Sequence, residues 1–149
     1  MRLIDWLKKV LAGEKPDPNF KLDQEQKFIH GLDVMAALEA HLKWRSRLEQ
    51  YILGNHSEKL DYKVVSQDNI CVLGQWLYGP AYQIFMYVPE YAALKSAHRE
   101  FHLFAAKILE EYQTGSKSTA KRMLAEQFNG YSGNVQRALV DLHKLAHGD

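Results

Sequence analysis

The most constraining feature of this chain is an apolar seam that repeats at alternating steps of three and four residues over much of its length. Such spacing places side chains on one face of an α-helix, as in helices that pack side by side. It predicts long helices over 23–53, 90–112 and 118–146. The sequence therefore predicts an all-α fold, a four-helix bundle of three long helices and one short, cysteine-bearing helix.

Shorter features are predicted between and within these helices. The short helix is expected over 69–78, and an extended piece over 62–65. The aromatic stretch 82–91 has no predicted form. In the last helix, Gly130 and Gly133 interrupt the seam, and we expect them to mark a kink or a close approach of helices.

The first twenty residues differ from the rest of the chain. Residues 2–12 form a short amphipathic stretch, and Pro16 and Pro18 lie in a segment rich in helix breakers. We expect an extra helix here that packs back onto the protein's own core. Residues 1–20 are therefore predicted as an N-terminal helix and linker, and residues 21–149 as the bundle.

Composition and charge exclude several classes of protein. The 149 residues are 46% hydrophobic and 25% charged, as is typical of one globular domain, and 19 basic residues are balanced by 18 acidic ones. This balance gives no electrostatic basis for binding nucleic acid or an anionic membrane. No apolar run approaches the ~20 residues of a bilayer span, and the charged first residues do not resemble a signal peptide. A single cysteine forms no internal disulfide, so we expect a cytoplasmic protein.

The candidate functional residues are three histidines and the cysteine. His98 and His102 are four residues apart on a predicted helix, so both imidazoles project from one face, a spacing that helical metal sites use. They lie on or beside the apolar face of Phe101, where an unpartnered imidazole is unfavourable. His41 occupies an inward position of the first long helix. Cys71 lies near the start of the short helix, where backbone N–H groups favour a thiolate.

As one set, these residue types indicate a zinc site. Three imidazoles and a thiolate form a donor set that Zn²⁺ prefers. Four protein ligands leave no open position for an activated water, so such a site is structural or sensory rather than hydrolytic. Taken singly, each histidine is also explained as a core or boundary residue, and Cys71 as a small buried hydrophobe. The pattern alone leaves both interpretations open.

Three short motifs resemble those of a known family. The chain reads His-Leu-Lys-Trp from His41, Cys-Val-Leu-Gly-Gln-Trp from Cys71 and His-Arg-Glu-Phe-His from His98. In this order they resemble the chemoreceptor zinc-binding (CZB) domain family, whose motifs are His-x-x-Trp, Cys-x-Leu-Gly-x-Trp and His-x-x-x-His. The resemblance spans residues 41–102, covers the last helix only loosely and does not include residues 1–20.

The resemblance implies one Zn²⁺ ion held by His41, Cys71, His98 and His102. It also implies a non-enzymatic regulatory domain in a homodimeric helical bundle. In that family the domain commonly regulates chemoreceptors or diguanylate cyclases, and responds to zinc or to oxidants that attack the zinc-bound cysteine. Family members are often joined to an output module. This chain begins at Met1 without room for one, so we expect a stand-alone member that acts on a protein partner in a signalling pathway.

Four further residues are expected around the site. Trp44 and Trp76 are predicted to pack around it and exclude water, which protects a thiolate. Phe101 shares the apolar face beside the histidine pair. Gly74, one turn beyond Cys71, is expected to let a neighbouring helix approach closely.

The other histidines are not predicted to be ligands. On a continuous helix, His30 shares the seam of His41 but lies about 16 Å from it, too far to bind the same ion. We interpret it as a core or interface residue. His56 falls in a predicted loop. His143 and His147 lie near the C-terminal end of the last helix, where positive charge suits the helix dipole.

Two other kinds of metal site remain alternatives. DinB-like metalloenzymes also hold a metal with three histidines in a helical bundle, but they keep an open coordination position. In that case Cys71 is a nearby nucleophile or a bystander. A hemerythrin-like di-iron site needs bridging carboxylates, and Glu100 is predicted to point away from the face of His98 and His102.

Overall fold

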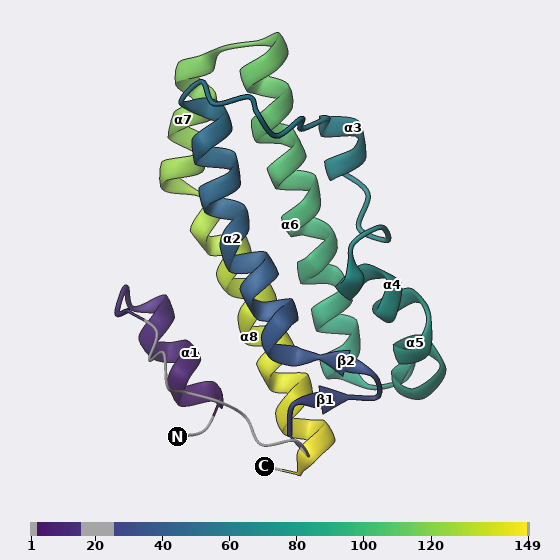
Figure 1. Cartoon of the computed structure of the whole chain (residues 1–149). Helices are drawn as coiled ribbons and strands as arrows, with labels where there is room; N and C mark the ends of the chain where they lie inside the picture. Colours follow the sequence, from purple (N-terminus) through teal and green to yellow (C-terminus); the bar gives the residue numbers. More distant parts are fainter. Residues whose placement is uncertain (1–2, 16–25, 149) are drawn as a thin grey trace.

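A computed structural model of the chain describes residues 3–15 and 26–148, which are helical apart from one short hairpin and the connecting loops (Figure 1). In chain order the elements are α1 (Leu3–Leu11), β1 (Phe28–Ile29), β2 (Leu32–Asp33), α2 (Val34–Ile52), α3 (Tyr62–Val65), α4 (Val72–Tyr78), α5 (Pro80–Phe85), α6 (Pro89–Thr114), α7 (Lys117–Glu126) and α8 (Phe128–His147). The predicted all-α bundle is confirmed.

Three long helical segments form the body of the bundle: α2, α6, and α7 continued by α8 (Figure 1). Apolar side chains fill the space between them, and the largest fully buried ones on these segments include Leu38, Leu48, Leu94, Phe101, Ile108, Leu109, Phe128 and Leu139. The short helix α3 packs on α6, while α4 and α5 lie beside the N-terminal part of α6. The Tyr91 hydroxyl on α6 donates to the Leu77 carbonyl on α4 at 2.7 Å, which fixes α4 in this position.

The N-terminal helix α1 packs against α8, as predicted for a segment that folds back on the protein's own core. Its side chains Leu3, Trp6 and Leu7 are buried and belong to the same apolar cluster as the bundle. The predicted linker around Pro16 and Pro18 lies outside the described residues. A domain boundary after residue 20 therefore stays a prediction.

The long helix predicted over 23–53 is wrong at its beginning. Residues 23–25 lie outside the described part of the chain, and the next residues form a hairpin in which Ile29 pairs with Leu32. His30 and Gly31, at the turn, have φ of 42° and 88°, the left-handed region that a tight two-residue hairpin turn requires. The Asp33 carboxylate then accepts from the Ala36 N–H at 3.0 Å and caps α2.

This hairpin corrects the interpretation of His30. Its side chain is exposed at the turn and does not lie on the seam of α2, so it is not a core residue. The apolar spacing continued across the hairpin because buried Ile29 and Leu32 are three residues apart, a step that also fits a helix.

The last predicted helix, 118–146, is two helices in the structure. α7 ends at Glu126 and α8 begins at Phe128, and Gln127 between them has φ −120° and ψ −30°. The break therefore precedes both glycines that were expected to mark it. An added Cβ at Gly130 would meet nothing within 4 Å, and the three atoms nearest to one at Gly133 belong to the side chain of Arg137, on the same helix.

One shorter segment differs from expectation, and the structure defines another that had no predicted form. The stretch 62–65, predicted as extended, is the helix α3, because Asp61 accepts from the Lys63 N–H at 2.9 Å and caps it despite the β-branched residues that follow. The stretch 82–91 contains the end of α5 and the start of α6. Among the described residues, no helix has the length and apolar character that a membrane span requires.

Candidate metal centre

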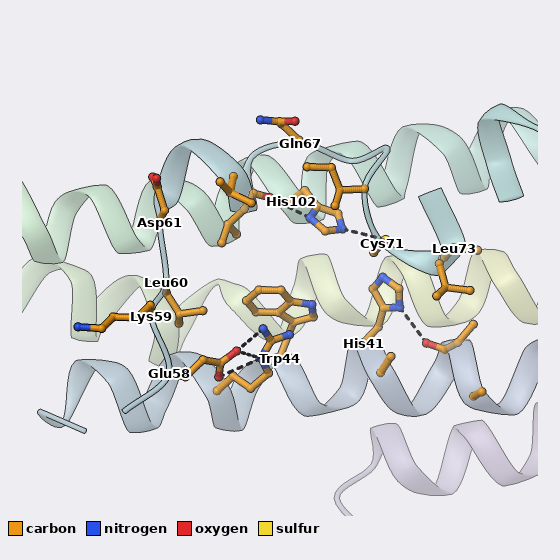
Figure 2. Close-up of a pocket in the computed structure, with 18 of the residues that line it drawn as sticks. His41, Trp44, Glu58, Lys59, Leu60, Asp61, Gln67, Cys71, Leu73 and His102 are labelled. Atoms are coloured by element: carbon orange, nitrogen blue, oxygen red, sulfur yellow. Dashed lines mark hydrogen bonds and ion pairs between the residues drawn. The ribbon is translucent and has the colours of Figure 1, made fainter. Parts of the chain in front are cut away.

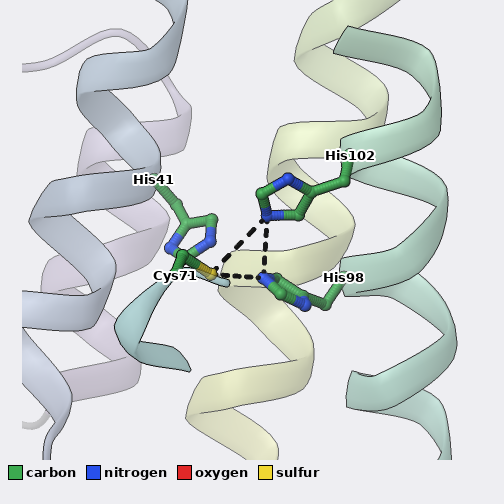
Figure 3. Close-up of side chains that lie close together, drawn as sticks. All are labelled: His41, Cys71, His98 and His102. Carbon is green, nitrogen blue, oxygen red and sulfur yellow. Dashed lines mark hydrogen bonds between the residues drawn. The ribbon is translucent and has the colours of Figure 1, made fainter. Parts of the chain in front are cut away.

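The structure brings the four predicted ligands to one point (Figure 3). Their ligand atoms all lie within 4.8 Å of one another, and the four residues are His41, Cys71, His98 and His102. The Cys71 Sγ lies 3.3 Å from Nε2 of His98 and 3.7 Å from Nε2 of His102, and these two nitrogens are 3.0 Å apart. The His41 ring completes the group, with its centroid 5.2 Å from that of His98.

Each of these side chains is positioned by its local structure. His41 projects from the middle of α2, and His98 and His102 project from one face of α6, one turn apart. Cys71 is the N-cap of α4, and its Sγ accepts the Gly74 N–H at 3.3 Å. Packing of α4 beside α6 therefore places a sulfur opposite the two imidazoles.

Burial sets the protonation of the cluster. The three histidines are at most 4% exposed, whereas Cys71 is partly exposed. Removal from water lowers the pKa of His41 to about 4 and the pKa of His98 to about 2, and it also lowers the pKa of His102. These imidazoles are neutral at pH 7. Burial raises the pKa of the Cys71 thiol, and the Gly74 and Leu73 N–H groups oppose this only in part, so the helix start alone does not supply a thiolate.

The hydrogen bonds show which ring nitrogens hold lone pairs. Nδ1 of His41 lies 2.8 Å from the Ala37 carbonyl oxygen, and Nδ1 of His102 lies 2.9 Å from that of Val65. A carbonyl only accepts, so both Nδ1 atoms are protonated, and each neutral ring therefore has a lone pair on Nε2. The buried Nε2 of His41 has no hydrogen-bond partner, and Nε2 of His102 faces Nε2 of His98.

This arrangement fits a metal ion. A ring oriented by an Nδ1–H bond to a carbonyl, with its other nitrogen free, is the usual state of a metal-binding histidine. Three imidazoles and one sulfur, with no carboxylate among them, match the preference of Zn²⁺. The donor set thus supports Zn²⁺ as the cofactor.

Two of the predicted neighbours lie against the histidine rings. The Phe101 ring is edge-on to His41 and His102, with centroids 5.3 and 5.4 Å apart. The Trp44 centroid is 6.3 Å from that of His102. Trp76 has a different position: its Nε1–H donates to the His30 carbonyl at 3.1 Å, which ties α4 to the hairpin.

Gly74 permits a close approach of backbone, but the approaching segment is not the neighbouring helix that was expected. A Cβ at Gly74 would lie 1.9 Å from the backbone oxygen of Asp68, so the neighbour is the loop before α4 rather than another helix. The same loop is held by the Tyr78 hydroxyl, which donates to Asp68 at 2.6 Å. Gly74 therefore sets the position of Cys71 relative to the preceding loop.

The remaining histidines have other contacts. His56 contacts the Tyr51 carbonyl at 3.0 Å. On α8, Nε2 of His143 lies 2.7 Å from the carbonyl oxygen of residue 26 and Nε2 of His147 lies 3.0 Å from that of residue 28. These two histidines thus bind the segment that leads into α2, a role beyond the predicted one at the helix end.

Sequence reasoning missed the groups that orient the ligand rings. The carbonyls of Ala37 and Val65 fix the tautomers of two histidines, yet a carbonyl belongs to every residue and gives no sequence signal. The contact with the Ala37 carbonyl could have been predicted, because Ala37 lies four residues before His41 on a predicted helix. The Val65 contact depends on how α3 packs on α6.

Comparison with known proteins agrees with this geometry. Residues 41–109 match the family model described as the chemoreceptor zinc-binding domain, and the match begins at His41 and includes the other three residues of the cluster. No curated protein and no solved structure matches the chain closely enough to count as a relative.

Proposed function

We propose that this chain is a zinc-binding regulatory module of a signalling pathway, and the match of residues 41–109 to the chemoreceptor zinc-binding domain supports this. One Zn²⁺ ion is held by His41, Cys71, His98 and His102. The observation that carries the proposal is the convergence of three buried imidazoles and one sulfur within 4.8 Å, with Nε2 of His41 buried and unpartnered.

The chemistry of the set supports regulation rather than hydrolysis. Four protein donors would fill the four positions that structural zinc uses, so a bound ion would connect helices instead of activating water. The position of Cys71, 3.3 Å from a histidine nitrogen, supports sulfur as a ligand. A DinB-like enzyme, in which Cys71 stays outside the shell, is the alternative that the following experiment distinguishes.

Cys71→Ser is expected to weaken zinc binding by more than about 100-fold, because changes to groups that only orient the ligands already cost 10–100-fold. Native mass spectrometry of protein purified without added metal should show one zinc per wild-type chain and none in the variant. In cobalt-substituted protein, a thiolate charge-transfer band should be present in the wild type and absent from the variant.

The matched control is His56→Ala, which removes a histidine outside the cluster and should retain one zinc per chain. Undiminished zinc affinity in Cys71→Ser would instead support the three-histidine enzyme site. The same spectra report oligomeric state, and we expect a homodimer.

The positions of the four ligands on different helices support a regulatory role. They belong to α2, to the start of α4 and to α6, so loss of the ion releases a connection between three helices. Zinc binding energy is then also folding energy, and the packing of the bundle depends on occupancy. We propose that this change alters contact with a cytoplasmic protein partner, such as a chemoreceptor or a diguanylate cyclase, in response to zinc or to oxidants.

Oxidation of Cys71 is expected to release zinc. The thiolate attacks one oxygen of hydrogen peroxide, an S–O bond forms, the O–O bond breaks and hydroxide leaves; the resulting sulfenic acid is a poorer ligand. Because Cys71 is the only cysteine, a sulfenic-acid label reports on this site alone. We expect about one zinc released per labelled chain, measured with a colorimetric chelator. Zinc that stays bound to labelled protein would exclude the redox response and leave zinc sensing intact.

A further inference from the structure

A cavity of about 560 Å³ lies between α2 and the segment 58–73 (Figure 2). On α2, the small side chains Ala36, Ala37 and Ala40 leave this space open, and Trp44 forms its aromatic wall. A volume in this range is typical of sites that bind small organic molecules.

The opposite wall is apolar and incompletely buried. Val64, Ile70 and Val72 line the cavity, and these residues are 50%, 47% and 75% exposed. Covering such surface is favourable by about 25 cal/mol per Å². The cavity therefore offers binding energy to an apolar occupant.

One end of the cavity is the metal centre itself. His41, Cys71 and His102 are among its lining residues, whereas His98 is not. Figure 2 shows these three side chains at one end, with Trp44 beside them. An occupant would thus lie against the partly exposed side of Cys71.

The charged groups at the rim do not call for a charged occupant. Arg47 pairs with Glu58 at 2.9 Å, and its guanidinium stacks over Trp44 at 3.7 Å. Asp61 caps α3, and Lys59 points away from Trp44 (Figure 2).

The same holds for the remaining rim carboxylate, Asp33, which caps α2 and pairs with Lys27 at 3.5 Å. A cationic ligand would compete with Arg47 and Lys27 for these carboxylates, and the remaining lining cation, Lys59, is exposed and points away from Trp44.

We propose that this cavity binds an uncharged, mainly apolar small molecule whose body lies against Trp44, and that its occupation shields Cys71 from solvent reagents. The binding claim stands without the metal. The shielding claim rests on the proposed function, because it concerns the same cysteine that holds zinc.

The test uses the full zinc-loaded chain and N-phenyl-1-naphthylamine, an uncharged probe that fluoresces in apolar surroundings. Wild type is expected to bind one probe per chain saturably. Ala40→Leu, which places a larger side chain in the cavity, should weaken binding at least about tenfold. Ala125→Leu makes the same change on an exposed position of α7 outside the cavity, and should bind like wild type.

Zinc content and circular dichroism are measured on every variant, so failure of the metal site and failure of the cavity are distinguished. If Ala40→Leu does not fold, Ala36→Leu fills the same wall nearer the start of α2. Absence of saturable binding to wild type, or wild-type affinity in the filled variant, would overturn the binding claim. Probe binding that declines as the chain dimerises would also overturn it, since a second copy would then be the occupant.

Shielding of Cys71 is measured by the rate at which its sulfur reacts. Reaction of its sulfur with iodoacetamide, measured by intact mass, should slow at least about threefold when the probe saturates the cavity. An unchanged rate despite a bound probe would contradict the shielding claim while leaving the binding claim standing.

Discussion

Removing zinc is expected to lower the melting temperature of this protein by about 8–16 °C. A ligand present at a thousand times its dissociation constant stabilises the folded state by about 4 kcal/mol, and each kcal/mol shifts the melting temperature of a chain of this size by about 2–4 °C. The four ligands connect α2, α4 and α6, so the metal-free protein also loses a connection between these helices. Circular dichroism melts with chelator, with zinc, and with zinc restored after chelation measure this shift.

Helix content should remain high at 20 °C in the metal-free protein. Core residues outside the cluster, such as Leu48 on α2 and Ile108 on α6, are fully buried between the helices. In Cys71→Ser, chelator and zinc should give nearly the same melting curve. Coincident curves for the wild type would show that the cluster contributes no binding energy to folding.

Gly74→Ala is expected to destabilise the protein by at least about 3 kcal/mol, at the upper end of the usual cost of overpacking. The new Cβ would lie 1.9 Å from a backbone oxygen of Asp68, so either the loop or α4 must move. Because Cys71 caps α4, this movement should also weaken zinc binding. Urea denaturation with and without zinc, together with a zinc titration, separates the two effects.

Gly130→Ala is the matched control for this change. Gly130 also lies in a helix, but a Cβ there would meet nothing within 4 Å. Replacing a helical glycine with alanine then stabilises the protein by roughly 0.5–1 kcal/mol. Equal effects of the two substitutions would contradict the assigned role of Gly74.

Much of the fold follows from periodic apolar positions. The helices α2, α6 and α8 were predicted because packing rewards a continuous apolar face, and this signal is strong in long segments. The signal fails where a non-helical structure gives the same spacing of buried residues. In the hairpin, Ile29 and Leu32 are three residues apart, as on one face of a helix, but they lie on two paired strands. The sign that a turn was needed is Gly31, which adopts a positive φ without strain.

The metal cluster was predictable as a set of residues but not as a geometry. The spacing of His98 and His102 places them on one helical face, whereas the approach of Cys71 depends on α4 packing beside α6. The cavity beside the cluster was not predicted, because it arises from the path of the loop that follows α2. Irregular segments of this kind have no periodic pattern to read.

The single hydrogen bond from Trp76 to the His30 carbonyl has a mechanical consequence. It attaches α4, whose N-cap is Cys71, to the hairpin turn, and His147 at the end of α8 contacts the carbonyl of residue 28 in the same hairpin. The hairpin therefore links α4 to the last turn of α8, and it leads directly into the first turn of α2. Two contacts, one from Trp76 and one from His147, thus connect the helix that Cys71 caps with the last residues of α8.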